Sequence, residues 1–194
     1  MSTYGNLQLR VSPEDYLTTA AIHEAAHAVV TIIVGQSVDH LWVDTERTPH
    51  SLEDGGTRTG GRCTTRGTIC AHLGSIHLYA GPMAQAKALV NLGYSETVAA
   101  AVEALSGLHD HQLVESFIDQ GAFVWTYRAR RDAEELLSSR KVWSKIIELS
   151  SILRLRGSLT GDEVHAIVGD ASKLNKNKIW TPNYEELEWT ATVN

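Results

Sequence analysis

Apolar residues recur along most of the chain with the spacing of helices. A helix is predicted over residues 13–34, because Ser12 can cap its first turn and Gly35 can end it. The second half of this helix, residues 25–34, is apolar on nearly every side. A helix of that kind is expected in the middle of a domain, where every face can be buried.

Residues 36–70 have a different pattern. Residues 38–43 are predicted to form a short strand. The segment 45–61 is rich in Thr, Gly, Asp and Pro, which is typical of a long loop. Residues 62–65 then return as a second strand candidate. We therefore expect a small β-hairpin-like element directly after the first helix.

Helical spacing resumes over residues 68–91, with a break predicted at Gly81-Pro82 because proline removes a backbone donor. Further helices are predicted over residues 95–107, 110–120 and 121–155, with a short last helix opened by Thr160. The fold class is therefore mainly α, with one small β element. We divide the chain into a polar arm (1–12), one domain (13–170) and a polar C-terminal tail (171–194).

Composition narrows the class of protein. The 194 residues are 43% hydrophobic and 21% charged, so one packed core is expected rather than disorder. A formal net charge of -6 argues against a main role in binding nucleic acid. Two cysteines exclude a disulfide scaffold, and no stretch reaches the roughly 20 apolar residues of a membrane span. We expect a cytoplasmic protein that does not bind membranes.

The first helix carries the sequence His23-Glu24-Ala25-Ala26-His27, an HExxH motif. Histidines four positions apart project from one helix face, about 5–6 Å apart at Cβ, so both imidazoles can reach one zinc ion. Glu24 lies about 100° around the helix from His23, beside the metal rather than on it. Its carboxylate is placed to act as general base toward a zinc-bound water.

Two histidines leave zinc short of a third protein ligand. The residues alone leave several candidates open: Glu103 and Glu115 on later helices, and Asp110 with its neighbours His109 and His111. Asp110 stands at a predicted helix start, where an aspartate can also be a simple N-cap. An anionic ligand would lower the charge that the ion carries into the protein interior.

The chain resembles the protease domain of FtsH-type zinc metallopeptidases. Residues 21–30, AIHEAAHAVV, are similar to that family's HEAGHA helix, and the predicted strand pair follows it. Residues 78–85, LYAGPMAQ, resemble its LGGRAAE helix, and residues 158–164 resemble its closing LTGEEV segment. Residues 107–110, GLHD, resemble its GASND segment. The resemblance implies that Asp110 is the third zinc ligand.

The chain also departs from that family. Ala26 replaces a glycine of the family pattern. Pro82 and Gln85 replace an arginine and a glutamate, and these two changes affect residues expected to support the metal ligands. The sequence contains no GxxxxGK[ST] motif. The resemblance therefore implies a peptidase domain without the ATPase module that normally delivers its substrate.

A second metal site, made of Cys63, Cys70 and His72, is a weaker alternative, and reduced thiols are the favoured interpretation of the two cysteines. His77 is expected on the helix that packs against the motif. The tail aromatics Trp180, Tyr184 and Trp189 could dock on the domain or on a partner.

These observations predict a Zn2+-dependent endopeptidase of the HExxH type. Its metal ligands would be His23, His27 and Asp110, its general base Glu24, and its substrate an unfolded or flexible polypeptide. Two alternatives stay open: a zinc-binding pseudopeptidase that binds a partner, and a narrow regulatory peptidase that cleaves one protein. A homo-oligomer and an ATPase partner acting in trans also stay open.

Overall fold

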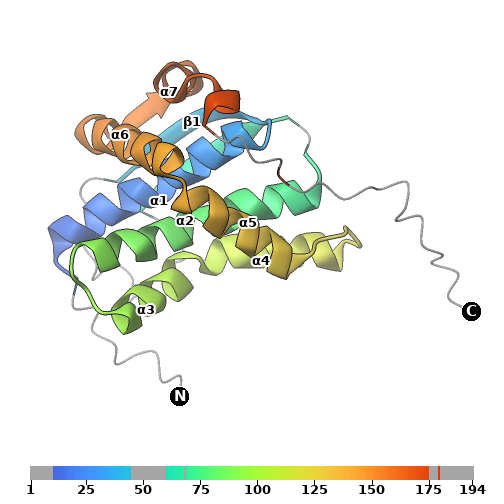
Figure 1. Ribbon diagram of the computed structural model, residues 1–194, viewed down its shortest axis with the longest axis horizontal. Coiled ribbons are helices and arrows are strands. Elements are labelled where there is room, and N and C mark those ends of the chain that lie inside the picture. Colours follow the sequence, from blue (N-terminus) through green and yellow to red (C-terminus); the bar gives the residue numbers. More distant parts are fainter. Residues whose placement is uncertain (1–10, 45–59, 68, 175–178, 180–194) are drawn as a thin grey trace, which may run out of the picture.

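The computed structural model describes residues 11–44, 60–67, 69–174 and 179. It is mainly helical with a small three-stranded sheet, which confirms the predicted fold class (Figure 1). In chain order the elements are α1 (Pro13–Ile33), β1 (Ser37–Val43), β2 (Gly61–Arg66), α2 (Ala71–Asn91), α3 (Glu96–Ser106), α4 (Leu108–Asp119), α5 (Thr126–Ser138), α6 (Arg140–Arg156), β3 (Ser158–Thr160) and α7 (Gly161–Val168), followed by a single 3-10 turn at Ala171–Lys173.

Helix α1 forms the centre of the molecule. Ser12 caps it as predicted, because its side chain accepts the backbone N–H of Asp15 at 3.1 Å. Every residue from Thr19 to Ile32 is buried. Helix α2 packs along one side of α1, while α6 and the sheet cover the other (Figure 1). An apolar helix of this kind can be buried on all sides because the chain places an element against each of them.

The sheet has the order β2-β1-β3. Strands β1 and β2 pair antiparallel with Leu41 opposite Cys63, which confirms the predicted hairpin-like element. The third strand was not predicted: Leu159 of β3 lies opposite Leu41 on the other edge of β1. Residues 45–59 of the predicted loop lie outside the described residues.

Helix α2 is continuous from Ala71 to Asn91, so the break predicted at Gly81-Pro82 is wrong. An interior proline removes one helical hydrogen bond and costs about 3 kcal/mol. The helix nevertheless packs against α1 on one side and against α3, α4 and α5 on others. Ala80 and Ala84, which flank the proline, are fully buried. This tertiary burial outweighs the local cost.

The predicted helical region 121–155 is two helices, α5 and α6, separated at Ser139. Helix α7 begins with a capping box in which Thr160 and Glu163 each bond the other's backbone N–H. Beyond it, Leu174 packs into the main core cluster, so the start of the predicted tail contacts the domain. Among the described residues, none of the helices combines the length and the apolar character that crossing a bilayer requires.

Candidate metal centre

The two histidines of the motif lie side by side on α1, close to where it packs against α2. Their Nε2 atoms are 3.0 Å apart, and both residues are only about 5% exposed. This convergence follows from the helix alone, because positions four apart share one face.

Asp110 comes to the same point from α4. Its Oδ2 atom lies 3.4 Å from His23 Nε2 and 3.6 Å from His27 Nε2. Asp110 belongs to the first turn of α4, whereas Gly107 occupies the N-cap position. The carboxylate is therefore not an N-cap, and it is free to face the imidazoles.

The outer nitrogen of each imidazole is held by an acceptor. His27 Nδ1 donates to the backbone carbonyl of His77 at 2.7 Å, and His23 Nδ1 lies 3.1 Å from Oε1 of Gln85. A neutral imidazole that donates from Nδ1 presents a bare lone pair at Nε2. When both imidazoles are neutral and donate from Nδ1, two such lone pairs converge with the Asp110 carboxylate, so this His–His–Asp cluster can hold a metal ion.

The pKa shifts of His27 and Asp110 are those of a cluster that can hold a cation. Burial acts to lower the pKa of His27, but the nearby Asp110 carboxylate raises it to about 9. Burial acts to raise the pKa of Asp110, yet the neighbouring His27 and His23 hold it well below its usual range. The cluster therefore attracts positive charge, which either a proton or a metal ion can supply.

Glu24 lies beside the cluster and is itself buried. Its carboxylate accepts the backbone N–H of Cys63 on β2 and feels the charges of His23, His27 and Asp110. Burial raises the pKa of Glu24 above its ordinary value, and the two histidines partly oppose that shift. A buried carboxylate with a raised pKa is suited to taking up a proton near neutral pH.

Two glycines leave the space that these side chains occupy. A Cβ at Gly81 would overlap Nε2 of His27 and lie 2.8 Å from His23 Cδ2, so the imidazoles rest directly on the backbone of α2. A Cβ at Gly61 would lie 2.5 Å from Glu24 Cγ. Any larger residue at either position would push a site residue away.

Two of the three residues that depart from the FtsH pattern, Pro82 and Gln85, contact elements that carry the candidate ligands. Gln85 meets His23, as described above. Pro82 packs against Gly107, where an added Cβ would lie 2.8 Å from the proline ring. Gly107 has a φ of −84°, so it is there for this close approach and not for an unusual backbone angle. The contact joins α2 to the start of α4, three residues before Asp110.

The other candidate ligands lie elsewhere. Glu103 pairs with Arg130 at 2.5 Å, and Glu115 is not in the cluster. His109 is exposed, and the ring of His111 faces Tyr79 at 5.5 Å between centroids. The ring of His77 lies 5.7 Å from that of His27 between centroids, and burial lowers the pKa of His77 to about 3. Of these residues, His77 is the one that hydrogen-bonds a member of the cluster, through its backbone carbonyl.

The proposed second site from Cys63, Cys70 and His72 does not form. Across the described part of the chain, His23, His27 and Asp110 are the one group of three or more such residues with converging ligand atoms. Both cysteines are free thiols, in agreement with the favoured interpretation. The tail aromatics Trp180, Tyr184 and Trp189 lie outside the described residues.

Sequence reasoning named Gln85 as a residue that concerns the support of the candidate ligands, but it missed two other groups around the cluster. Thr19, whose hydroxyl lies 3.4 Å from Gln85 Nε2, and the carbonyl of His77 carried no signal, because their contacts join residues far apart in sequence.

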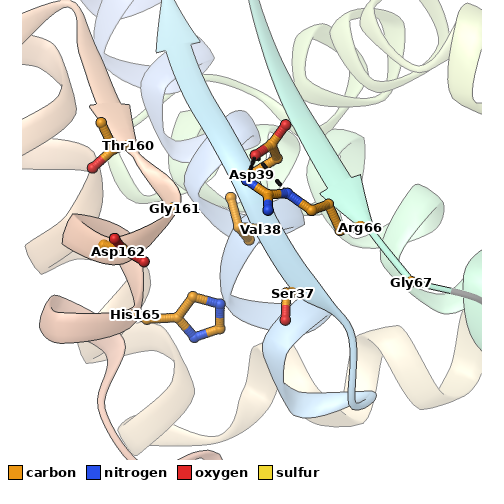
Figure 2. A pocket seen from close by; sticks show the side chains of 9 residues that line it. All are labelled: Ser37, Val38, Asp39, Arg66, Gly67, Thr160, Gly161, Asp162 and His165. Atoms are coloured by element: carbon orange, nitrogen blue, oxygen red, sulfur yellow. Dashed lines mark hydrogen bonds and ion pairs between the residues drawn. The ribbon is translucent and has the colours of Figure 1, made fainter.

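A separate groove lies between the end of β2, the start of β1 and α7 (Figure 2). Asp39 and Arg66 form an ion pair on one side of it, and Asp162 and His165 of α7 stand on the other. Neither Glu24 nor any member of the His–His–Asp cluster lines this groove. It is therefore not the candidate metal centre.

Comparison with known proteins adds no assignment, because no family model and no curated protein match the sequence of this chain.

Proposed function

We propose that this chain is a zinc-dependent endopeptidase, similar in its protease chemistry to the FtsH family. The observation that carries the proposal is the spacing of three ligand atoms, at 3.0, 3.4 and 3.6 Å. Tetrahedral zinc with bonds of about 2.0–2.1 Å needs its ligand atoms roughly 3.3–3.4 Å apart. Two imidazoles and a carboxylate are also a donor set that zinc accepts, with one position left open.

When bound, zinc supplies a Lewis acid that lowers the pKa of a coordinated water to about 7. Glu24 is the residue that takes up the proton as water attacks a peptide carbonyl, and it returns the proton to the leaving amine. Its buried carboxylate is held in place by the N–H of Cys63 and by the space at Gly61. These contacts support a fixed position for the general base.

Strand β2 offers a place for an extended substrate. Within the described residues it has one neighbour in the sheet, β1, on one of its two edges. The backbone N–H of Asp44 donates to the carbonyl of Gly60 at 2.5 Å. In an antiparallel ladder, hydrogen-bonded residue pairs alternate with pairs that are not hydrogen-bonded. The N–H of Cys63 therefore points away from β1, toward Glu24. A peptide added along this second edge would pass beside the general base.

An edge-pairing site selects extended chains, so an unfolded protein is the first substrate to test. The zinc-loaded protein should cleave casein, and a chelator should abolish the cleavage. Glu24→Gln should keep stoichiometric zinc and lose about 10²–10⁴-fold in rate, because an amide cannot take up the proton. Glu14→Gln on the same helix, which alters an exposed pair with Arg154, is the matched control and should keep full activity.

Two results would contradict the proposal. If Glu24→Gln cleaved casein at the wild-type rate, Glu24 would not be the base. If zinc-loaded protein cleaved neither casein nor any co-expressed protein, the chain would be a zinc-binding partner module. Cleavage of one co-expressed protein and not casein would indicate a narrow regulatory peptidase.

A further inference from the structure

Gln85 is a buried polar side chain that contacts a candidate metal ligand. It is 1% exposed on α2, and its Oε1 lies 3.1 Å from Nδ1 of His23. An amide has two different ends, so it can present either an acceptor or a donor to the imidazole. The orientation of Gln85 therefore decides which nitrogen of His23 carries the proton.

Thr19 sets the orientation of this amide. The Thr19 hydroxyl, fully buried on α1, donates to the backbone carbonyl of Tyr16 at 3.1 Å. A hydroxyl has one hydrogen, so Thr19 Oγ1 can only accept from its other neighbour. That neighbour is Nε2 of Gln85, at 3.4 Å. The NH2 end of the amide thus faces Thr19, and its oxygen faces His23.

The orientation matters for the metal centre. With the oxygen toward it, His23 Nδ1 is the donor, and the lone pair at Nε2 faces Asp110 and His27. With the amide reversed, Nδ1 would accept from the NH2 group and Nε2 would carry a hydrogen. A protonated Nε2 cannot bind a metal ion.

His27 has no such dependence. Its Nδ1 donates to the backbone carbonyl of His77, a group that can only accept. Of the two histidines, only His23 relies on a side chain that can present either end.

We propose that Thr19 and Gln85 act as a positioning pair: Thr19 orients the amide of Gln85, and the amide fixes the tautomer of His23 that binds the metal ion. This inference rests on the proposed function only in that a metal ion must bind at the His–His–Asp cluster. It does not depend on cleavage of any substrate.

The test compares zinc affinity in four chains, measured by competition with a chromophoric chelator. They are the wild type, Thr19→Val, Gln85→Glu and the double variant. Thr19→Val should weaken zinc binding about tenfold, the lower end of the usual loss when a residue supporting a ligand is removed. In the Gln85→Glu background the same change should have less than about a twofold effect, because an ionised carboxylate accepts with either oxygen.

Thr18→Val is the matched control. Thr18 makes the same kind of hydrogen bond back along α1, to the carbonyl of Glu14 at 2.8 Å, whereas the hydrogen bonds of Gln85 among the described residues go to His23 and Thr19. Its zinc affinity should equal that of the wild type. Circular dichroism of each metal-free variant shows whether the chain is folded before zinc is added.

The pattern across the two backgrounds separates positioning from general stability. If Thr19→Val weakened zinc binding by the same factor in the wild type and in the Gln85→Glu variant, Thr19 would act only on packing and the inference would be wrong. No loss of affinity in either background would overturn it too. Failure of the proposed function shows separately, as zinc-loaded wild type that cleaves no protein.

Discussion

At the residue scale, the absence of a side chain at Gly81 leaves the space that the candidate ligands His23 and His27 occupy. The imidazoles of His23 and His27 occupy the position where a side chain would begin. In an isolated helix, replacing an interior glycine by alanine would stabilise by roughly 0.5–1 kcal/mol. Helix propensity at position 81 therefore favours alanine, whereas the packing of the two imidazoles requires glycine.

Gly81→Ala is expected to abolish tight zinc binding, because its Cβ would overlap Nε2 of His27 and force the imidazole away. Gly74→Ala on the same helix is the control. Its Cβ would lie 3.5 Å from Phe117, an ordinary contact, so zinc binding should be unchanged. Zinc per chain after dialysis against a weak chelator measures both. Stoichiometric zinc in Gly81→Ala would contradict the packing of the imidazoles on α2.

The third ligand is tested at the same scale. Asp110→Ala is expected to weaken zinc binding severely and to abolish cleavage, because the cluster loses its one anionic ligand candidate. His109→Ala and His111→Ala should each retain one zinc per chain, since neither imidazole is in the cluster. The three variants are dialysed together and analysed for metal. Loss of zinc in a histidine variant, with retention in Asp110→Ala, would require another ligand set.

At the element scale, the start of α7 has a measurable pH dependence. Glu163 accepts the backbone N–H of Thr160 and pairs with Arg156, and these contacts lower its pKa from about 4.5 to about 2. A lowered pKa in the folded state means that the unfolded chain binds the proton more readily. The stabilisation is therefore complete above pH 4.5 and is lost as the pH falls toward 2.

Glu163→Gln is expected to lower the melting temperature at pH 7 and to have a diminishing effect from pH 4.5 down to pH 2. The measurement is the difference in melting temperature between wild type and variant at each pH. Glu148→Gln removes an exposed carboxylate that pairs with Lys145 on its own helix, and it should change little at any pH. A difference for Glu163→Gln that stayed constant down to pH 2 would contradict the cap.

At the scale of the whole molecule, the His–His–Asp cluster joins α1 and α4, two helices that otherwise share few contacts. Helix α4 buries only Asp110 and Val114, whereas α1 is buried along most of its length. A metal ion held by both helices would fasten α4 to the core. A ligand that binds only the folded chain stabilises it by about 2.7 kcal/mol at roughly 100 times its Kd.

Chelation is therefore expected to lower the melting temperature, with α4 losing its protection from hydrogen exchange before α1 does. Scanning calorimetry of zinc-loaded and chelated protein measures the first effect, and exchange followed by mass spectrometry the second. Asp110→Ala should respond little to the chelator. An unchanged melting curve, with metal removal verified, would count against a site that joins α1 to α4.

The sequence by itself determined the part of the site that lies within one helix. His23 and His27 share a face because any α-helix brings positions four apart together, and Glu24 follows from the same geometry. The N-cap at Ser12 and the capping box at Thr160 are local in the same sense. The mainly helical fold could be predicted for this reason, since most of its elements carry their own periodicity.

Only the tertiary structure decided the features that depend on contacts between residues far apart in the sequence. Strand β3 has three residues, too few for a pattern, and exists because β1 offers an edge. Helix α2 continues through Pro82 because burial on several sides outweighs one lost hydrogen bond. The placement of Asp110 and the Thr19–Gln85 contact join separate helices. The distances between residues on separate helices cannot be read from the order of residues along the chain, because they depend on how the helices pack.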